Sequence, residues 1–143
     1  MRSPSRLAAS DHARIIALWE QAGLEHKPAG RDTAKAFADQ LSQGMIAIGV
    51  ENSVGELIGT VFATHDARKG WINRLAVHPD YRRRGVAQQL IEAAEAALHA
   101  EGLEIIAALI EPENGASIAL FSAAGYSTYP GIVYMTKRER PEI

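Results

Sequence analysis

The stretch from Leu75 to Ala87 places a strand, a turn and the start of a helix in immediate succession. Residues 71–77 are apolar and β-branched enough for a buried strand, which Pro79 ends because proline fixes φ and removes a backbone donor. Apolar residues then recur at helical spacing, at Ala87, Leu90, Ile91, Ala94 and Leu98. A helix that directly follows a buried strand points its free N–H groups at the carboxyl edge of the sheet, where they favour an anion.

The composition of this turn suits a pyrophosphate group. Gly85 lets an anion approach the backbone without a Cβ in the way, and Arg82, Arg83 and Arg84 surround the same spot with positive charge. The sequence contains neither the Gly-x-x-x-x-Gly-Lys-Ser/Thr loop of nucleoside triphosphatases nor the Gly-x-Gly-x-x-Gly loop of dinucleotide-binding folds. The simpler alternative is a basic turn that only caps an ordinary helix.

Two motifs resemble those of the GNAT superfamily, the acetyl-coenzyme A-dependent N-acyltransferases. Arg82-x-x-Gly85-x-Ala87 is similar to the family's Arg/Gln-x-x-Gly-x-Gly/Ala signature. The stretch from Asn114 to Tyr126 is similar to its Asn-x-x-Ala-x-x-Leu-Tyr-x-x-x-Gly-Phe element. The resemblance implies acetyl-coenzyme A or coenzyme A as co-substrate and no metal.

The same resemblance implies which residues bind the coenzyme. In the family, the strand that holds Leu75 and Val77 splays away from its neighbour, and the pantetheine arm enters the gap. Asn114 matches a family residue that lies beside the thiol. The alternative role, as N-cap of the last helix, agrees equally well with the preference for asparagine at that position. The implied coenzyme-binding residues are Leu75, Ala76, Val77, Arg82, Arg83, Arg84, Gly85, Val86, Ala87, Gln88, Asn114, Ser117 and Phe121.

Length and charge describe one globular domain over residues 1–143 with a formal net charge of −2. A net acidic chain without an interleaved aromatic platform argues against nucleic acid as a partner. The absence of cysteine excludes a disulfide framework and a thiolate nucleophile. No apolar run approaches the ~20 residues of a membrane span, and no hydrophobic region follows the basic start, so we expect a cytoplasmic protein without a membrane partner.

The pattern of apolar residues predicts an α/β (α+β) fold, and the resemblance implies that this fold is of the GNAT type. One mixed, mainly antiparallel sheet of six to seven strands is expected, flanked by about four helices on its two faces. The run from Glu104 to Ile110 is almost continuously apolar, which is typical of a strand buried on both faces. The expected strands are 6–8, 45–51, 57–65, 71–77, 104–110 and 132–137, and the expected helices begin near residues 11, 33, 86 and 115.

The residues that would move protons depart from the family pattern. Phe121 stands where the family often has a tyrosine as general acid, and a phenyl ring has no proton to give. Asn73 stands on the strand that often carries the base, and it accepts no proton, although it could hold a water. Trp71 and Asn73 are expected to line the acceptor pocket, with the core as the alternative place for Trp71.

The candidates for proton transfer that remain lie at strand ends. Glu111 and Glu113 follow one strand, and His65 and Asp66 precede the central one. We take Glu111 as the candidate base, against the alternative of a solvated carboxylate at a turn. Tyr134 could act as the acid, although an aromatic residue on a strand is more often packing.

Together these features predict an N-acetyltransferase that acts by direct attack in a ternary complex. Without cysteine, no thiol can carry the acyl group, so the amine would attack the thioester itself. The acceptor would be a small-molecule or peptide amine of unidentified class. The alternative function is a coenzyme A-binding regulatory module with little or no catalysis. Apolar residues on the last strand would favour a homodimer.

Overall fold

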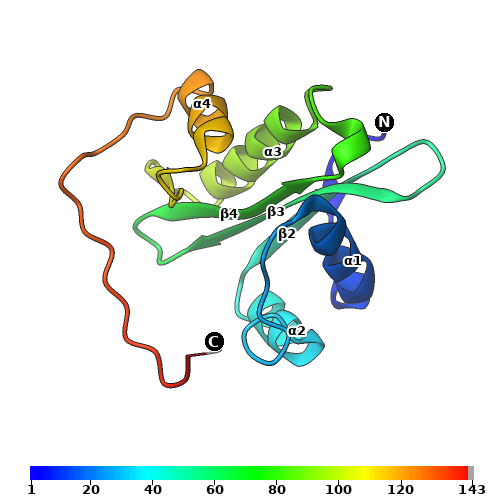
Figure 1. Cartoon of the computed structure of the whole chain (residues 1–143), viewed down its shortest axis with the longest axis horizontal. Helices are drawn as coiled ribbons and strands as arrows, with labels where there is room; N and C mark the ends of the chain where they lie inside the picture. Colours follow the sequence, from blue (N-terminus) through cyan, green and yellow to red (C-terminus); the bar gives the residue numbers. More distant parts are fainter. Residues whose placement is uncertain (142–143) are drawn as a thin grey trace.

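A mixed sheet of five strands, with helices on both of its faces, forms the body of the molecule (Figure 1). The structure is a computed structural model and describes residues 1–141. Strands follow one another in the order β1-β2-β3-β4-β5; all neighbours are antiparallel except β4 and β5, which are parallel. The strands are β1 Ser5–Arg6, β2 Ile46–Glu51, β3 Leu57–His65, β4 Gly70–Val77 and β5 Ile106–Ala108. The helices are α1 His12–Ala22, α2 Ala34–Ser42, α3 Val86–Ala100 and α4 Gly115–Ala123.

The helices begin and end where local sequence signals place them. Thr33 caps α2, because its hydroxyl accepts from the Ala36 amide at 3.0 Å. Gly23 ends α1 in the left-handed region, with φ of 78°, which glycine adopts without a Cβ penalty. These observations confirm the helix boundaries expected from the sequence to within about two residues.

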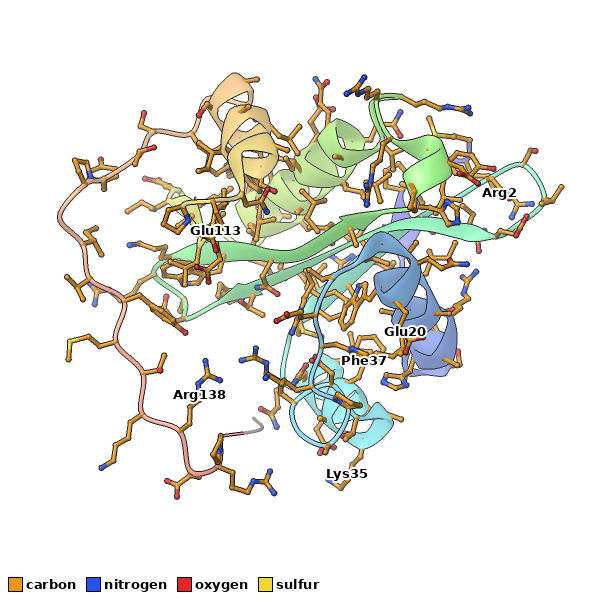
Figure 2. All side chains as sticks on the ribbon, in the orientation of Figure 1. Arg2, Glu20, Lys35, Phe37, Glu113 and Arg138 are labelled. Carbon is orange, nitrogen blue, oxygen red and sulfur yellow. The ribbon has the colours of Figure 1, made fainter. Side chains whose placement is uncertain are left out.

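Alternate residues of the strands divide the core into two layers. One layer packs between the sheet and α3, and it includes Ile48 and Leu90, which are almost fully buried. The other packs between the sheet and the pair α1 and α2, and it centres on Trp19, Phe37 and Phe62. Figure 2 shows Phe37 between α2 and the sheet. Because successive strand residues face opposite sides, each strand contributes to both layers.

Two expectations about the end of the chain are wrong. The strand expected over residues 104–110 is only three residues long, Ile106–Ala108, and it is half-buried rather than buried on both faces. The strand expected over 132–137 does not form, so the described residues contain five strands and not six or seven. The reasons are linked: without a further strand beside it, β5 is an edge strand, and the apolar run around it has neighbours on one side only.

None of the helices within residues 1–141 is long and apolar enough to cross a bilayer.

Candidate active site

A bulge in β4 divides the central strand into two parts. Thr60 pairs with Ala76 and Phe62 pairs with Asn73, so two residues of β4, Arg74 and Leu75, lie opposite Val61 alone. Arg74 has φ of 54°, in the left-handed region that a residue with a Cβ rarely adopts. The bulge bends the strand and turns residues 75–77 away from the line of residues 70–73.

A gap in the pairing of β4 with β5 lies beside this bulge. β4 pairs with β5 only through residues 70–72, which leaves residues 73–77 without a partner on that side. The His78 amide donates to the Ile58 carbonyl of β3 at 2.8 Å. Because successive residues of an antiparallel strand point in alternate directions, the N–H and C=O of Val77 face away from β3 and toward the gap. The end of the pairing is what the expected splaying requires, and the Val77 N–H is a backbone donor that faces the unpaired side.

The turn after β4 leads into a helix whose first backbone amides are not capped by a side chain of the described residues. Residues 79–81 form a single 3₁₀ turn, and α3 begins with Gly85 as its N-cap, at φ of 79°. No side chain of the described residues caps this helix, and a Cβ built on Gly85 would meet nothing within 4 Å. A left-handed residue followed by a helical one directs successive N–H groups into one concavity, which suits an anion.

The three arginines of this turn have different partners. Arg82 donates to the Ala22 carbonyl at the end of α1 at 3.0 Å and to the Val77 carbonyl at 3.4 Å. Arg84 lies over the Tyr81 ring, 5.2 Å from its centroid. The Arg83 side chain is exposed, and it makes no hydrogen bond or ion pair with the rest of residues 1–141. Arg82 thus holds α1 to β4, and Arg83 is the arginine available to a ligand.

The residues expected on the α4 side and on α3 have local roles in the structure. Asn114 caps α4, because its Oδ1 accepts from the Ser117 amide at 3.1 Å. This confirms the capping role that the sequence left open for Asn114. Gln88, on the first turn of α3, donates to Glu92 on the same helix at 3.3 Å. The Ala87 side chain beside it is half-buried and Val86 is fully buried, so these two residues could offer a ligand only their backbone.

Phe121 is part of the core. It is 6% exposed, and its ring meets the edge of Tyr126, with centroids 5.0 Å apart. The Tyr126 hydroxyl donates to the Glu95 carboxylate at 2.9 Å. Burial, with the nearby Glu95 carboxylate, raises the pKa of Tyr126 far above its ordinary value. Neither ring therefore offers an accessible proton at neutral pH.

The face of β4 toward α1 and α2 contains an ion pair that sequence reasoning missed. The Arg74 guanidinium lies 3.1 Å from the Asp32 carboxylate in the loop between α1 and α2, and it donates to the Glu25 carbonyl in the same loop. Arg74 also lies over the Trp19 ring, 5.0 Å from its centroid. Asp32 accepts in addition from the Lys27 amide at 2.6 Å. One sequence feature could have indicated this pair: Arg74 stands in the middle of an apolar strand. A partly buried arginine side chain requires a partner for its charge.

Trp71 and Asn73 lie on the same face of β4, toward α1 and α2. They pair with Thr64 and Phe62 of β3, and Phe62 belongs to the core layer beneath α1 and α2. Asn73 is exposed, and Trp71 is half-buried beneath the Lys69 ammonium, which is 5.3 Å from the ring centroid. A small cavity opens on the same face, lined by residues of α1, α2 and β3 with Arg31 and Asp32 at its rim. The two residues expected at the acceptor pocket thus share a face with this cavity.

The candidates for proton transfer are not brought together. Tyr134 is 68% exposed on a segment that forms no strand, so the idea that it projects from a last strand is wrong. Glu111 is exposed after β5. His65 accepts from the Ala67 amide, and Asp66 accepts from Arg68 and Lys69 amides, which lower its pKa. His65 and Asp66 therefore shape the β3–β4 turn. Within residues 1–141, no group of three or more His, Asp or Glu side chains could hold a metal ion.

A family model shows the family of this chain, curated relatives agree with it, and solved structures share its fold. The model of the acetyltransferase (GNAT) family matches residues 12–126. An acetyltransferase of Sodalis glossinidius is 29% identical over 128 residues, which cover 90% of this chain and 89% of that protein. The structure of AAC(6')-Iy with the bisubstrate analogue CoA-S-monomethyl-acetylneamine is similar to this one, with a TM-score of 0.77 at 21% identity. The matched region covers 95% of this chain and 97% of the AAC(6')-Iy chain. The PaiA N-acetyltransferase of Thermoplasma acidophilum, solved with coenzyme A, has a TM-score of 0.78 at 14% identity over 90% of this chain and 92% of its own. The chain therefore belongs to the acetyltransferase (GNAT) family, and it is an acyltransferase.

Proposed function

We propose that this protein transfers an acetyl group from acetyl-coenzyme A to a primary amine by direct attack in a ternary complex. The observation that carries the proposal is the gap in the pairing of β4 with β5, which the Val77 N–H faces, followed along the chain by the uncapped start of α3 at Gly85. In this proposal the thioester arm lies along the unpaired part of β4, and the anionic group binds at the turn. The acceptor would approach from the face that holds Trp71 and Asn73.

The residues of the turn fit a pyrophosphate. Open space at Gly85, an uncapped helix start and the exposed Arg83 side chain supply backbone donors and one flexible positive charge. Of residues 75–77, which the family resemblance implies for the arm, Val77 would bind it by its N–H, whereas the backbone of Ala76 faces β3, opposite Thr60. The coenzyme supplies an activated acetyl group, and the Val77 N–H would hold the thioester oxygen as negative charge develops there.

Most of the catalysis would come from orientation and from this hydrogen bond. The departing thiolate needs little help, because a thiol with a pKa of about 8.5 ionises readily near neutrality. The amine is the harder problem: an alkyl ammonium with a pKa of about 10.4 costs roughly 4.6 kcal/mol to deprotonate at pH 7, whereas an α-ammonium costs about 1 kcal/mol. Since the candidate acids and bases are scattered, we propose that the acceptor reaches the site already deprotonated or loses its proton to water.

The acceptor class is open to a direct screen. Arg74 and Asp32 pair with one another, and Arg31 and Lys69 lie on the same face, so this face has no cluster of carboxylates that would select a polycationic amine. Free amino acids, polyamines, a neamine-type aminoglycoside and peptides with a free N-terminus cover the amine classes that such a face could accept. Purified protein with acetyl-coenzyme A and each amine in turn should release free thiol, which a colorimetric reagent detects. The acceptor is the amine that raises the rate above the hydrolysis background.

Coenzyme binding has its own test. Calorimetry should detect coenzyme A, and ligand at about a hundred times its dissociation constant should raise the free energy of unfolding by roughly 2.7 kcal/mol. Gly85→Val should abolish binding because its side chain fills the approach to the amides. Gly102→Val is the matched control, since Gly102 is also left-handed with open space, at the other end of α3. No binding at millimolar coenzyme A would overturn the proposal, and binding without turnover of any amine would favour a regulatory module instead.

A further inference from the structure

Asn52 is a buried polar residue that connects two parts of the molecule. It follows β2 in the β2–β3 hairpin, and it is 7% exposed. Its Oδ1 accepts from the Val54 amide at 3.1 Å and from the Glu56 amide at 2.9 Å. Its Nδ2 donates to the Glu56 carboxylate at 3.2 Å and to the Tyr81 hydroxyl at 3.1 Å. The two amides on Oδ1 fix the orientation of this side chain, so Nδ2 faces Tyr81.

Three of these bonds lie within the hairpin, and the bond to Tyr81 leaves it. Tyr81 belongs to the turn between β4 and α3, 29 residues further along the chain. Figure 1 shows the hairpin and this turn at the same end of the sheet. The Tyr81 ring is half-buried and packs against the core layer of α3, so its hydroxyl meets Asn52 from a fixed position. The hydrogen bond therefore ties the turn to the hairpin.

The Tyr81 ring also restrains both ends of its own turn. The His78 ring meets it edge-on, with centroids 5.9 Å apart. The His78 Nδ1 in turn accepts from the Asp80 amide at 3.1 Å. The Arg84 guanidinium lies over the Tyr81 ring, and the attraction of a cation for the face of a ring limits the freedom of this side chain. Residues on either side of Tyr81 thus depend on the place of its ring.

The conformation of this turn needs support from its neighbours. Arg83 has φ of 62° and Gly85 has φ of 79°, both in the left-handed region. Glycine adopts this region freely, whereas a residue with a Cβ does so only where surrounding contacts hold it. The flanking contacts are those of Arg82 with the end of α1 and of Tyr81 with the hairpin. The form of the turn that gathers backbone amides therefore depends on both contacts.

We propose that Tyr81 is a positioning residue for coenzyme A, because its hydrogen bond from Asn52 holds residues 82–85 in the form that binds the pyrophosphate. Neither side chain touches the ligand in this role. When the binding form of a site is only partly populated, the apparent dissociation constant rises by the inverse of that fraction. The role rests on the proposed binding of coenzyme A at this turn, and it extends the site to the β2–β3 hairpin.

Tyr81→Phe tests the role, because it removes the hydroxyl and keeps the ring that packs against the core and holds Arg84. We expect calorimetry to give a dissociation constant for coenzyme A about threefold to tenfold higher, the effect of one hydrogen bond. Dephospho-coenzyme A lacks the 3′-phosphate but keeps the pyrophosphate, so its constant should rise by the same factor.

Tyr126→Phe is the matched control. It removes a hydroxyl that donates to Glu95 of α3 at 2.9 Å, away from the hairpin and the turn. Both variants should lose some stability in chemical denaturation, so the affinity for coenzyme A separates a positioning role from a merely structural one. We expect Tyr126→Phe to leave the constants for coenzyme A and dephospho-coenzyme A unchanged.

Nuclear magnetic resonance on the free protein gives a second measurement without coenzyme. The order parameters of the Arg84 and Gly85 amides should fall in Tyr81→Phe and stay unchanged in Tyr126→Phe. Equal affinity of the unmodified protein and Tyr81→Phe for coenzyme A would overturn the positioning role alone. A loss seen with coenzyme A but not with dephospho-coenzyme A would place the effect on the 3′-phosphate and would overturn it as well. No binding of coenzyme A by the unmodified protein would overturn the proposed function, and this role with it.

Discussion

The Arg74 guanidinium and the Asp32 carboxylate lie 3.1 Å apart and join the bulge of the central strand to the loop between α1 and α2. Their side chains are 17% and 8% exposed, so the pair is shielded from water. Burial lowers the pKa of the Arg74 guanidinium, and the Asp32 carboxylate opposes that shift. The residue in the left-handed region of β4 thus also fixes the loop between α1 and α2, the loop that the proposed acceptor would approach.

Breaking this pair should loosen the acceptor side without affecting coenzyme binding. Arg74→Met leaves the Asp32 carboxylate without its charge partner, and we expect a loss of about 2–4 kcal/mol in the free energy of unfolding. Asp32→Asn keeps a polar side chain and should cost less. In steady-state kinetics, both variants should raise KM for the amine, while calorimetry with coenzyme A should give an unchanged dissociation constant. If the two variants weakened coenzyme binding as much as they raised KM for the amine, the effect of the ion pair would not be confined to the loop between α1 and α2.

Arg82 and Arg83 should have different roles: Arg82 should stabilise the fold, and Arg83 should bind the coenzyme. Arg82→Ala removes hydrogen bonds to the Ala22 and Val77 carbonyls, so it should lower the free energy of unfolding by about 1–2 kcal/mol. Arg83→Ala should leave stability almost unchanged and weaken coenzyme binding by about 1–2 kcal/mol, since a flexible charge near water is partly screened. Chemical denaturation and calorimetry on both variants measure the two effects. Equal effects on stability would show that the assignment of Arg82 and Arg83 is wrong.

The sequence predicted local features well and long-range ones poorly. Leu57–His65 and the cap at Thr33 were predictable because β-branched runs and capping residues act over a few positions. The partner of Arg74 lies 42 residues away and that of Arg82 lies 60 residues away, and no periodicity reports such pairs. The length of β5 was overestimated for a similar reason. An apolar run shows that burying its side chains is favourable, but it does not show which other segment packs against it.

Phe121→Tyr should destabilise the protein rather than improve catalysis. Phe121 is buried against the Tyr126 ring, so an added hydroxyl without a partner should cost about 1–3 kcal/mol in the free energy of unfolding. Turnover should not rise, because the new hydroxyl would lie in the core rather than beside a departing thiolate. Thermal denaturation and thiol release test both parts. A stable variant with a turnover gain of tenfold or more would place position 121 at the reacting atoms after all.

Acid should remove the contribution of an ion-pair network at the end of β2. Glu51 accepts from Arg14 at 2.8 Å and from Arg2 at 2.9 Å, and these bonds lower its pKa below the ordinary value of 4.5. A carboxyl with a lowered pKa in the folded state stabilises it above the unfolded pKa, and this effect is lost as pH falls through the folded pKa. The stability difference between the natural protein and Glu51→Gln should therefore be largest near neutrality and should shrink below about pH 4.5. Denaturant titrations across this range measure the difference, and one that stays constant down to pH 3 would rule out the network as its source.

Turnover should rise with pH up to the pKa of the acceptor itself. Phe121 has no proton to exchange, and backbone hydrogen bonds keep Asp66 a weak base, so the free amine fraction should set the rate. With an alkyl amine, kcat/KM should increase about tenfold per pH unit toward a break near pH 10, whereas a peptide N-terminus should give its break near pH 8. The decisive comparison uses two acceptors of different pKa with the same enzyme. If both profiles break at one shared pH, the protein supplies the base, and Glu111→Gln then becomes the variant that should remove the break.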